Sequence, residues 1–177
     1  DLKTALNEIT IDKEHVYQKW IQWATQRSDK LEEVLEYAFN GNEKERLRGS
    51  WILHHVSDKR PEVFYVKEKM MIEQLEKTQT DAEVRFILRY YSKYRLPRHE
   101  KREGLLADYC FKVLMTPSDA VAPRVYSMSI LHKLVLRYPE LAHELQESIQ
   151  WALETGSAGM KSRGKKILQD LSKKGLI

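Results

Sequence analysis

Residues 120–137 read AVAPRVYSMSILHKLVLR, and this stretch decides the fold. Its apolar side chains recur at Val121, Val125, Met128, Leu131 and Val135, in steps of 4, 3, 3 and 4 residues. That spacing places them on one face of an α-helix, because successive helical residues turn by about 100°. A helix with one apolar face is stable only when that face is buried against a neighbour. The stretch therefore predicts an amphipathic helix within a larger helical assembly.

The same periodicity continues outward from this stretch. Leu141, Leu145, Ile149 and Ala152 form the next stripe, in steps of 4, 4 and 3 residues. Sustained alternation of apolar and polar residues is missing from the sequence, so no strand is indicated. A short turn or helix is expected within residues 1–9. The longer predicted helices are 12–26, 28–40, 43–58, 61–77, 81–94, 98–115, 120–137, 139–155 and 158–174.

These helices form pairs, and the pairs repeat. Their first members begin near residues 12, 43, 81, 120 and 158, so the later starts lie 38, 39 and 38 residues apart. An arginine recurs in the first members at Arg48, Arg85, Arg124 and Arg163. A two-helix unit of roughly 40 residues is typical of HEAT-type solenoids, in which stacked pairs share one continuous core. We therefore predict an all-α, right-handed α-solenoid of about four helical pairs plus a terminal helix.

Two capping-box patterns mark predicted helix starts. Asn42 with Glu45, and Thr80 with Glu83, have the spacing in which each side chain caps the backbone of the other. Helices are therefore expected to begin near residues 43 and 81.

Glycine and proline mark the remaining boundaries. Gly41 and Gly156 follow predicted helices, where a left-handed backbone conformation favours glycine. Pro61, Pro97 and Pro139 each precede or open a new periodic segment, as suits a residue without a backbone N–H.

Length and composition limit the class of protein. The chain has 177 residues, of which 42% are hydrophobic, enough for one core, and we expect a single domain over residues 1–177. No apolar run approaches the roughly 18 residues of a membrane span. Cys110 is the one cysteine, so no internal disulfide can form and a reducing, cytoplasmic location is expected. The sequence begins at Asp1 rather than at Met, which leaves open whether a segment precedes it.

Three stretches carry a resemblance to a known family. They are Arg48–Leu53 (RGSWIL), Ala122–Met128 (APRVYSM) and Gly156–Leu168 (GSAGMKSRGKKIL). The chain resembles short, single-domain bacterial HEAT-like proteins over about residues 12–172. The resemblance implies the helical-repeat fold and implies almost nothing about activity. Some members carry the name adenylosuccinate lyase.

The lyase name can be compared with the sequence. Lyases of that type carry a loop of the form Gly-Ser-Ser-x-Met-Pro-x-Lys-x-Asn. Gly156, Ser157 and Met160 agree with it. The second serine, the proline, the lysine and the asparagine are replaced by Ala158, Lys161, Arg163 and Lys165. A serine before a basic amphipathic segment is typical of a helix N-cap, so we expect no lyase activity.

No other catalytic, metal or cofactor pattern is present in the sequence. The histidines form no H-x-x-x-H or H-E-x-x-H pair, so neither a metal nor a cofactor is expected. Cys110 lies on the apolar side of its predicted helix and is expected to be a buried, unreactive thiol. Trp20, Trp51 and the other aromatic residues are expected to fill the core between helices. We therefore expect a protein that is not an enzyme.

Charge is unevenly distributed along the chain. Residues 1–84 carry 13 Lys and Arg against 17 Asp and Glu, whereas residues 85–177 carry 17 against 9. The last predicted helix is the most basic. The candidate partner-binding residues are Arg124, Lys161, Arg163, Lys165 and Lys166.

The balance of charge suggests which partner each surface would take. The predicted second helices of the pairs, 28–40, 61–77, 98–115 and 139–155, together carry a net charge of −7. Second helices usually line the inner face of a HEAT-type stack, and an acidic face repels phosphate. The first hypothesis is therefore a non-catalytic scaffold that binds a basic or apolar protein segment. The alternative is a nucleic-acid-binding solenoid, related to alkyl-base DNA glycosylases, that uses the basic C-terminal helix. The oligomeric state stays open.

Overall fold

The computed structural model describes residues 1–8, 13–78 and 80–177. Every element within these residues is helical, which confirms the all-α class predicted from the periodicity. None of the described helices is long and apolar enough to cross a membrane. The elements are α1 (Leu2–Asn7), α2 (Lys13–Gln26), α3 (Ser28–Asn40), α4 (Glu43–Lys59), η1 (Pro61–Lys67), α5 (Glu68–Lys77), α6 (Asp81–Lys93), α7 (Glu100–Met115), α8 (Val121–Val135), η2 (Pro139–Leu141), α9 (Ala142–Thr155) and α10 (Ala158–Lys173).

The helix boundaries follow the sequence pattern closely, with one kind of difference. The predicted helices 61–77 and 139–155 each begin as a short 3-10 helix, at Pro61 and Pro139. Proline fixes φ and has no N–H to donate, so it is tolerated in a first turn. We refer below to α2, α4, α6, α8 and α10 as the first helices, and to α3, α5, α7 and α9 as the second helices.

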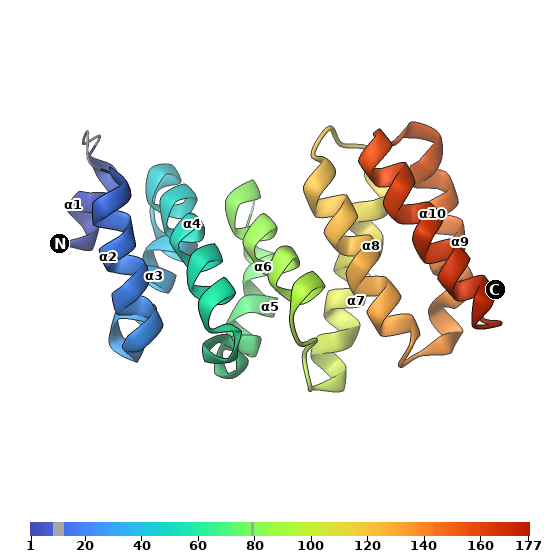
Figure 1. Ribbon diagram of the computed structural model, residues 1–177, viewed down its shortest axis with the longest axis horizontal. Helices are drawn as coiled ribbons and strands as arrows, with labels where there is room; N and C mark the ends of the chain where they lie inside the picture. Colours follow the sequence, from blue (N-terminus) through green and yellow to red (C-terminus); the bar gives the residue numbers. More distant parts are fainter. Residues whose placement is uncertain (9–12, 79) are drawn as a thin grey trace. The chain divides into compact units, whose positions relative to one another are not determined.

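The chain divides into two compact units, Asp1–Tyr90 and Tyr91–Ile177. Figure 1 shows the first unit as the blue-to-green helices and the second as the yellow-to-red helices. In the first unit, α2 packs against α3 and α4, and α1 packs against α4. In the second, α8 packs against α7 and α10, and α9 packs against α7 and α10. In both units, therefore, a helix packs against helices of the neighbouring hairpin.

An aromatic cluster fills the core of the first unit between η1 and α6. The Phe64 ring lies 5.4 Å from the rings of Phe86 and Tyr90, and all three side chains are buried. The Tyr90 hydroxyl donates to the carbonyl oxygen of Pro61 at 2.9 Å. The core of the second unit is aliphatic, with Leu106, Leu131 and Ile149 fully buried.

Polar contacts join neighbouring hairpins at the period of the repeat. The partners are 37 or 38 residues apart, close to the 38 or 39 residues between the starts of successive predicted pairs. The pairs are Asn7–Glu45, Arg46–Glu83 and His132–Asp170. Each pair links helices of neighbouring repeats and so helps to hold one repeat in register with the next.

The two capping boxes have different outcomes. Asn42 Oδ1 accepts from the Glu45 N–H at 3.0 Å, and Glu45 Oε2 accepts from the Asn42 N–H at 2.8 Å, so this box is confirmed. The helix at residue 81 begins as expected, but Glu83 is buried and accepts from Arg46 and Gln74 instead. The Thr80 N–H donates to the Thr78 hydroxyl. The partly exposed Arg46 thus pairs with the buried carboxylate that the local sequence pattern assigned to the cap.

The prediction of left-handed conformations at Gly41 and Gly156 is wrong. Their φ angles are −74° and −87°, and Gly175 is the described residue with a positive φ, at 66°. Both positions need glycine for lack of space. A Cβ at Gly41 would overlap the Tyr37 carbonyl oxygen, and one at Gly156 would lie 2.6 Å from the Ala152 carbonyl oxygen.

Glycines inside the helices differ in their surroundings, which predicts opposite effects of substitution. A Cβ at Gly49 in α4 would lie 3.0 Å from Ala38 Cα in α3, whereas one at Gly104 in α7 meets nothing within 4 Å. Gly49→Val is expected to lower the free energy of unfolding by about 1–3 kcal/mol through overpacking. Gly104→Ala is expected to raise it by up to about 1 kcal/mol. Urea denaturation followed by circular dichroism measures both, and equal signs for the two variants would contradict the packing described.

His54 is expected to make the first unit sensitive to acid. Burial, with a smaller contribution from the Arg89 charge, lowers the pKa of His54 from 6.5 to about 4, and its ring packs edge-on against Phe86. Between these values the unfolded chain holds the proton and the folded chain does not, so stability falls as the pH drops from 6.5 to 4.

This loss of stability should depend on the imidazole. At pH 4.5 we expect the wild type to have lost roughly 2 kcal/mol more, relative to pH 7, than His54→Leu has lost. Urea midpoints of both proteins at the two pH values provide the measurement. An identical pH response in the two proteins would show that His54 does not carry the effect.

Candidate functional site

The five predicted partner-binding residues separate into one buried arginine and one exposed group. Arg124 is 3% exposed, and its Nη2 donates to the Leu114 carbonyl oxygen at 3.2 Å. Its guanidinium lies 5.8 Å from the centre of the Trp151 ring, and burial lowers its pKa. Arg124 therefore joins α8 to the end of α7 and to α9. The prediction that Arg124 binds a partner is therefore wrong, because a buried guanidinium cannot reach a partner.

The other four residues lie on the outer surface of α10. Lys161, Arg163, Lys165 and Lys166 are exposed, and within the described part of the chain none of them has an ion-pair partner. The opposite face of α10 is buried through Met160, Ile167 and other apolar residues. The apolar stripe therefore fixes α10 in the second unit and leaves these cations in solvent.

The stretch that resembles the lyase loop forms the start of α10. Ser157 is the N-cap, and its hydroxyl accepts from the Met160 N–H at 3.4 Å. Met160 is buried, and Gly156 lies too close to Ala152 to carry a side chain. The three residues that agree with the lyase pattern thus have structural roles, and the N-cap prediction is confirmed.

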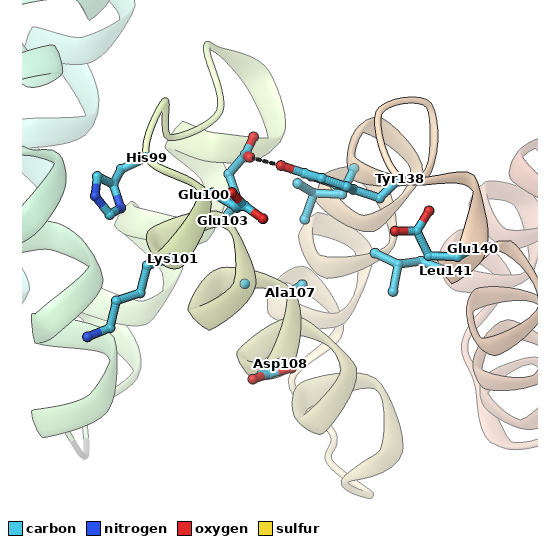
Figure 2. Close-up of a pocket in the computed structure, with 11 residues that line it drawn as sticks. His99, Glu100, Lys101, Glu103, Ala107, Asp108, Tyr138, Glu140 and Leu141 are labelled. Carbon is cyan, nitrogen blue, oxygen red and sulfur yellow. Dashed lines mark hydrogen bonds between the residues drawn. The ribbon is translucent and has the colours of Figure 1, made fainter.

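One pocket lies in the second unit, between α7 and the segment that leads into α9. Its volume is about 690 Å³. Figure 2 shows Tyr138, Glu140 and Leu141 on one side and the α7 residues on the other. The apolar part of the lining is Ala107, Leu134 and Leu141.

Charged groups surround this apolar lining. Glu100, Asp108 and Glu140 are exposed carboxylates, against the exposed cation Lys101 and the imidazole of His99. The pocket therefore has an excess of negative charge at its rim.

Glu103 supports one wall of this pocket from inside. It is 3% exposed and accepts hydrogen bonds from the Arg137 guanidinium and the Tyr138 hydroxyl. The partners lie 34 and 35 residues away in sequence. A buried carboxylate needs such partners, because an unpaired charge in the interior is costly. This pair of bonds fixes Tyr138 at the pocket edge.

A second pocket lies in the first unit, between α3 and the segment formed by η1 and α5. Its volume is about 460 Å³, and Leu35 and Phe39 form its base. Val66 and Met70, which are 82% and 39% exposed, stand at its rim. Lys67 and Glu32 form an ion pair across it. Both pockets thus lie between a second helix and the 3-10 helix that leads into the next second helix of the same unit.

Sequence reasoning missed the residues of these pockets. Their lining is composed of ordinary helix-surface residues, and a single sequence gives no sign that two of them face each other across a hairpin. One signal was available for the larger pocket. Gly104 lies within a predicted helix, where glycine weakens the structure and therefore calls for an explanation.

The other residue types that often carry chemistry, namely cysteine, metal ligands and aromatic residues, show no sign of a reactive site in the described part of the chain. Burial raises the pKa of the Cys110 thiol to about 12, so it stays protonated near neutral pH. Among the residues that the structure describes, no group of three or more His, Cys, Asp or Glu is placed to hold a metal ion. Trp20 and Tyr91 are buried as expected, but Trp51 is 40% exposed.

Comparison with known proteins shows the family. The sequence matches the HEAT repeat domain family over residues 2–171, so the chain belongs to that family. The repeat type inferred from the period is therefore confirmed. No curated protein and no solved structure matches the chain closely enough to show a relationship.

Proposed function

We propose that this protein is a non-catalytic helical-repeat scaffold that binds a basic segment of a partner protein along its second helices. The observation that carries the proposal is the position of two pockets, one in each unit, each lined by a second helix and by the 3-10 helix that leads into the next second helix. HEAT-type repeats use the surface of stacked helices for binding, because the stack itself supplies the core.

Charge and polarity support a basic segment as the ligand. The second helices are acidic as a group, and three exposed carboxylates surround the larger pocket. The smaller pocket presents Val66 and Met70 beside charges of both signs. A segment that alternates cationic and apolar side chains would complement either surface. We infer that binding takes place in the cytoplasm, where one buried, reduced cysteine is ordinary.

Photo-crosslinking tests this proposal directly. Benzoylphenylalanine replaces Met70 at the smaller pocket or Lys101 at the larger one, and Gln22 or Gln169 on the first helices as controls; all four positions are exposed. We expect the pocket positions to crosslink one partner through a segment rich in Lys or Arg, identified by mass spectrometry. Crosslinks confined to the control positions would reject the second helices as the binding surface.

The basic surface of α10 supports a second candidate, nucleic-acid binding. Four cations without ion-pair partners on one helix are an arrangement that favours a polyanion. Binding would be salt-dependent, because each phosphate contact releases counterions.

The test of the second candidate compares two sets of substitutions. We expect duplex DNA or single-stranded RNA to bind with a log–log salt slope of about −3. Replacing Lys161, Arg163, Lys165 and Lys166 by Gln should abolish binding. The same replacement of Lys44, Lys59, Lys77 and Lys112, which are exposed on other helices, should have little effect. Equal losses in the two variants would reject α10 as the site.

The absence of lyase activity stays a prediction. Incubation of the protein with adenylosuccinate should release no fumarate above the rate of the buffer alone.

A further inference from the structure

Gly104 has no packing role in the fold. A Cβ at Gly49 would lie 3.0 Å from Ala38 Cα, and one at Gly164 would lie 2.9 Å from Ile149 Cγ2, so both glycines allow close contact between helices. At Gly104 an added Cβ would meet no atom within 4 Å. Glycine inside a helix is less stable than alanine, because it loses more conformational freedom on folding. The fold therefore gives no reason for glycine at this position.

The larger pocket does give a reason. Gly104 lines it, together with residues 100, 103, 107 and 108 of the same helix. These positions share one face of α7, because residues three and four apart are neighbours on a helix. Because Gly104 and Ala107 have almost no side chain, the middle of this face is recessed relative to the longer side chains beside it. Glu100 and Asp108 stand on either side of it along the helix. The result is a trough with an apolar base and a carboxylate at each end.

We propose that this trough receives the side chain of an arginine or lysine from the basic partner segment, an inference that rests on the proposed function. The aliphatic stem would lie over Gly104 and Ala107, as such stems do on apolar surfaces. The cationic head would meet the carboxylates of Glu100, Asp108 or Glu140, which can accept charge-assisted hydrogen bonds. The same pocket wall already binds one guanidinium, since Arg137 donates to Glu103. Gly104 is thus the specificity-determining residue, because any larger side chain would occupy the place of the stem.

Backbone NMR of the whole protein tests the proposal with a defined probe. The probe is Ac-Gly-Arg-Gly-NH₂ or its lysine counterpart, and the control is the same tripeptide with neutral, isosteric citrulline. Because exposed ion pairs are weak, we expect dissociation constants on the order of millimolar. Shifts of the Gly104 and Ala107 amides should saturate with the cationic probes. Citrulline should bind at least about tenfold more weakly.

Matched variants distinguish binding in the trough from nonspecific attraction of the cationic probe to exposed carboxylates elsewhere on the protein. Gly104→Leu should abolish the shifts, whereas Gly159→Leu, at another exposed helical glycine with open surroundings, should preserve them. If Gly104→Leu fails to fold, the combined E100Q, D108N and E140Q variant makes the same test. Its control is E144Q, E147Q and E154Q, which removes three exposed carboxylates of α9 outside the pocket.

The outcomes distinguish this inference from the proposed function. Absent shifts, equal binding of citrulline, or equal losses in the two triple variants would each overturn the trough as a cation site. The partner crosslinked at Met70 would then still support a scaffold that binds along its second helices. Loss of the Met70 crosslink with intact probe binding would instead retain the cation site and reject the wider proposal.

Discussion

Within each unit, helices bury an apolar stripe against neighbouring helices: α2 packs against α3 and α4, and α8 packs against α7 and α10. A single pair of helices would leave half of that stripe in water, so the stability of each pair depends on its neighbour. The buried stripe also determines which side chains of each helix are exposed and can contact a partner. Because the buried face of α10 is fixed by Met160 and Ile167, Lys161 and Lys166 must face solvent. Burial therefore determines the exposed surfaces as much as it determines the core.

Polar groups define the register within this apolar framework. The pairs Asn7–Glu45 and His132–Asp170 join residues one repeat apart. Lys133 is a further example, since its ammonium donates to the Tyr91 and Tyr94 carbonyl oxygens at the end of α6, and burial lowers its pKa to about 8. Apolar packing alone tolerates small slips between helices, whereas a buried charge without its partner is costly. These contacts select one alignment of each hairpin on the next.

The larger pocket shows how a repeat protein gains a site without disturbing its core. The carboxylate of Glu103 is held internally by Arg137 and Tyr138, which stabilises the wall. The opening in front of that wall depends on a residue that lacks a side chain, Gly104. Binding specificity in this picture comes from one small residue and a few exposed carboxylates, on a scaffold that repetition has already made stable.

The amino-acid sequence by itself determined the helices, their pairing and the repeat, because apolar periodicity and capping are local properties of the chain. It also located the capping box of Asn42 and Glu45 and the N-cap at Ser157. Only the tertiary structure decided how far each of the four recurrent arginines is buried: Arg124 is buried and Arg48 is half-buried, whereas Arg85 and Arg163 are exposed. Only the structure shows that Glu83 pairs with Arg46. Only the structure shows that a side chain has no room at Gly41 but has room at Gly104. These outcomes depend on which residues of distant hairpins face each other, and that information is contained in the packing of helices and not in the period of any one of them.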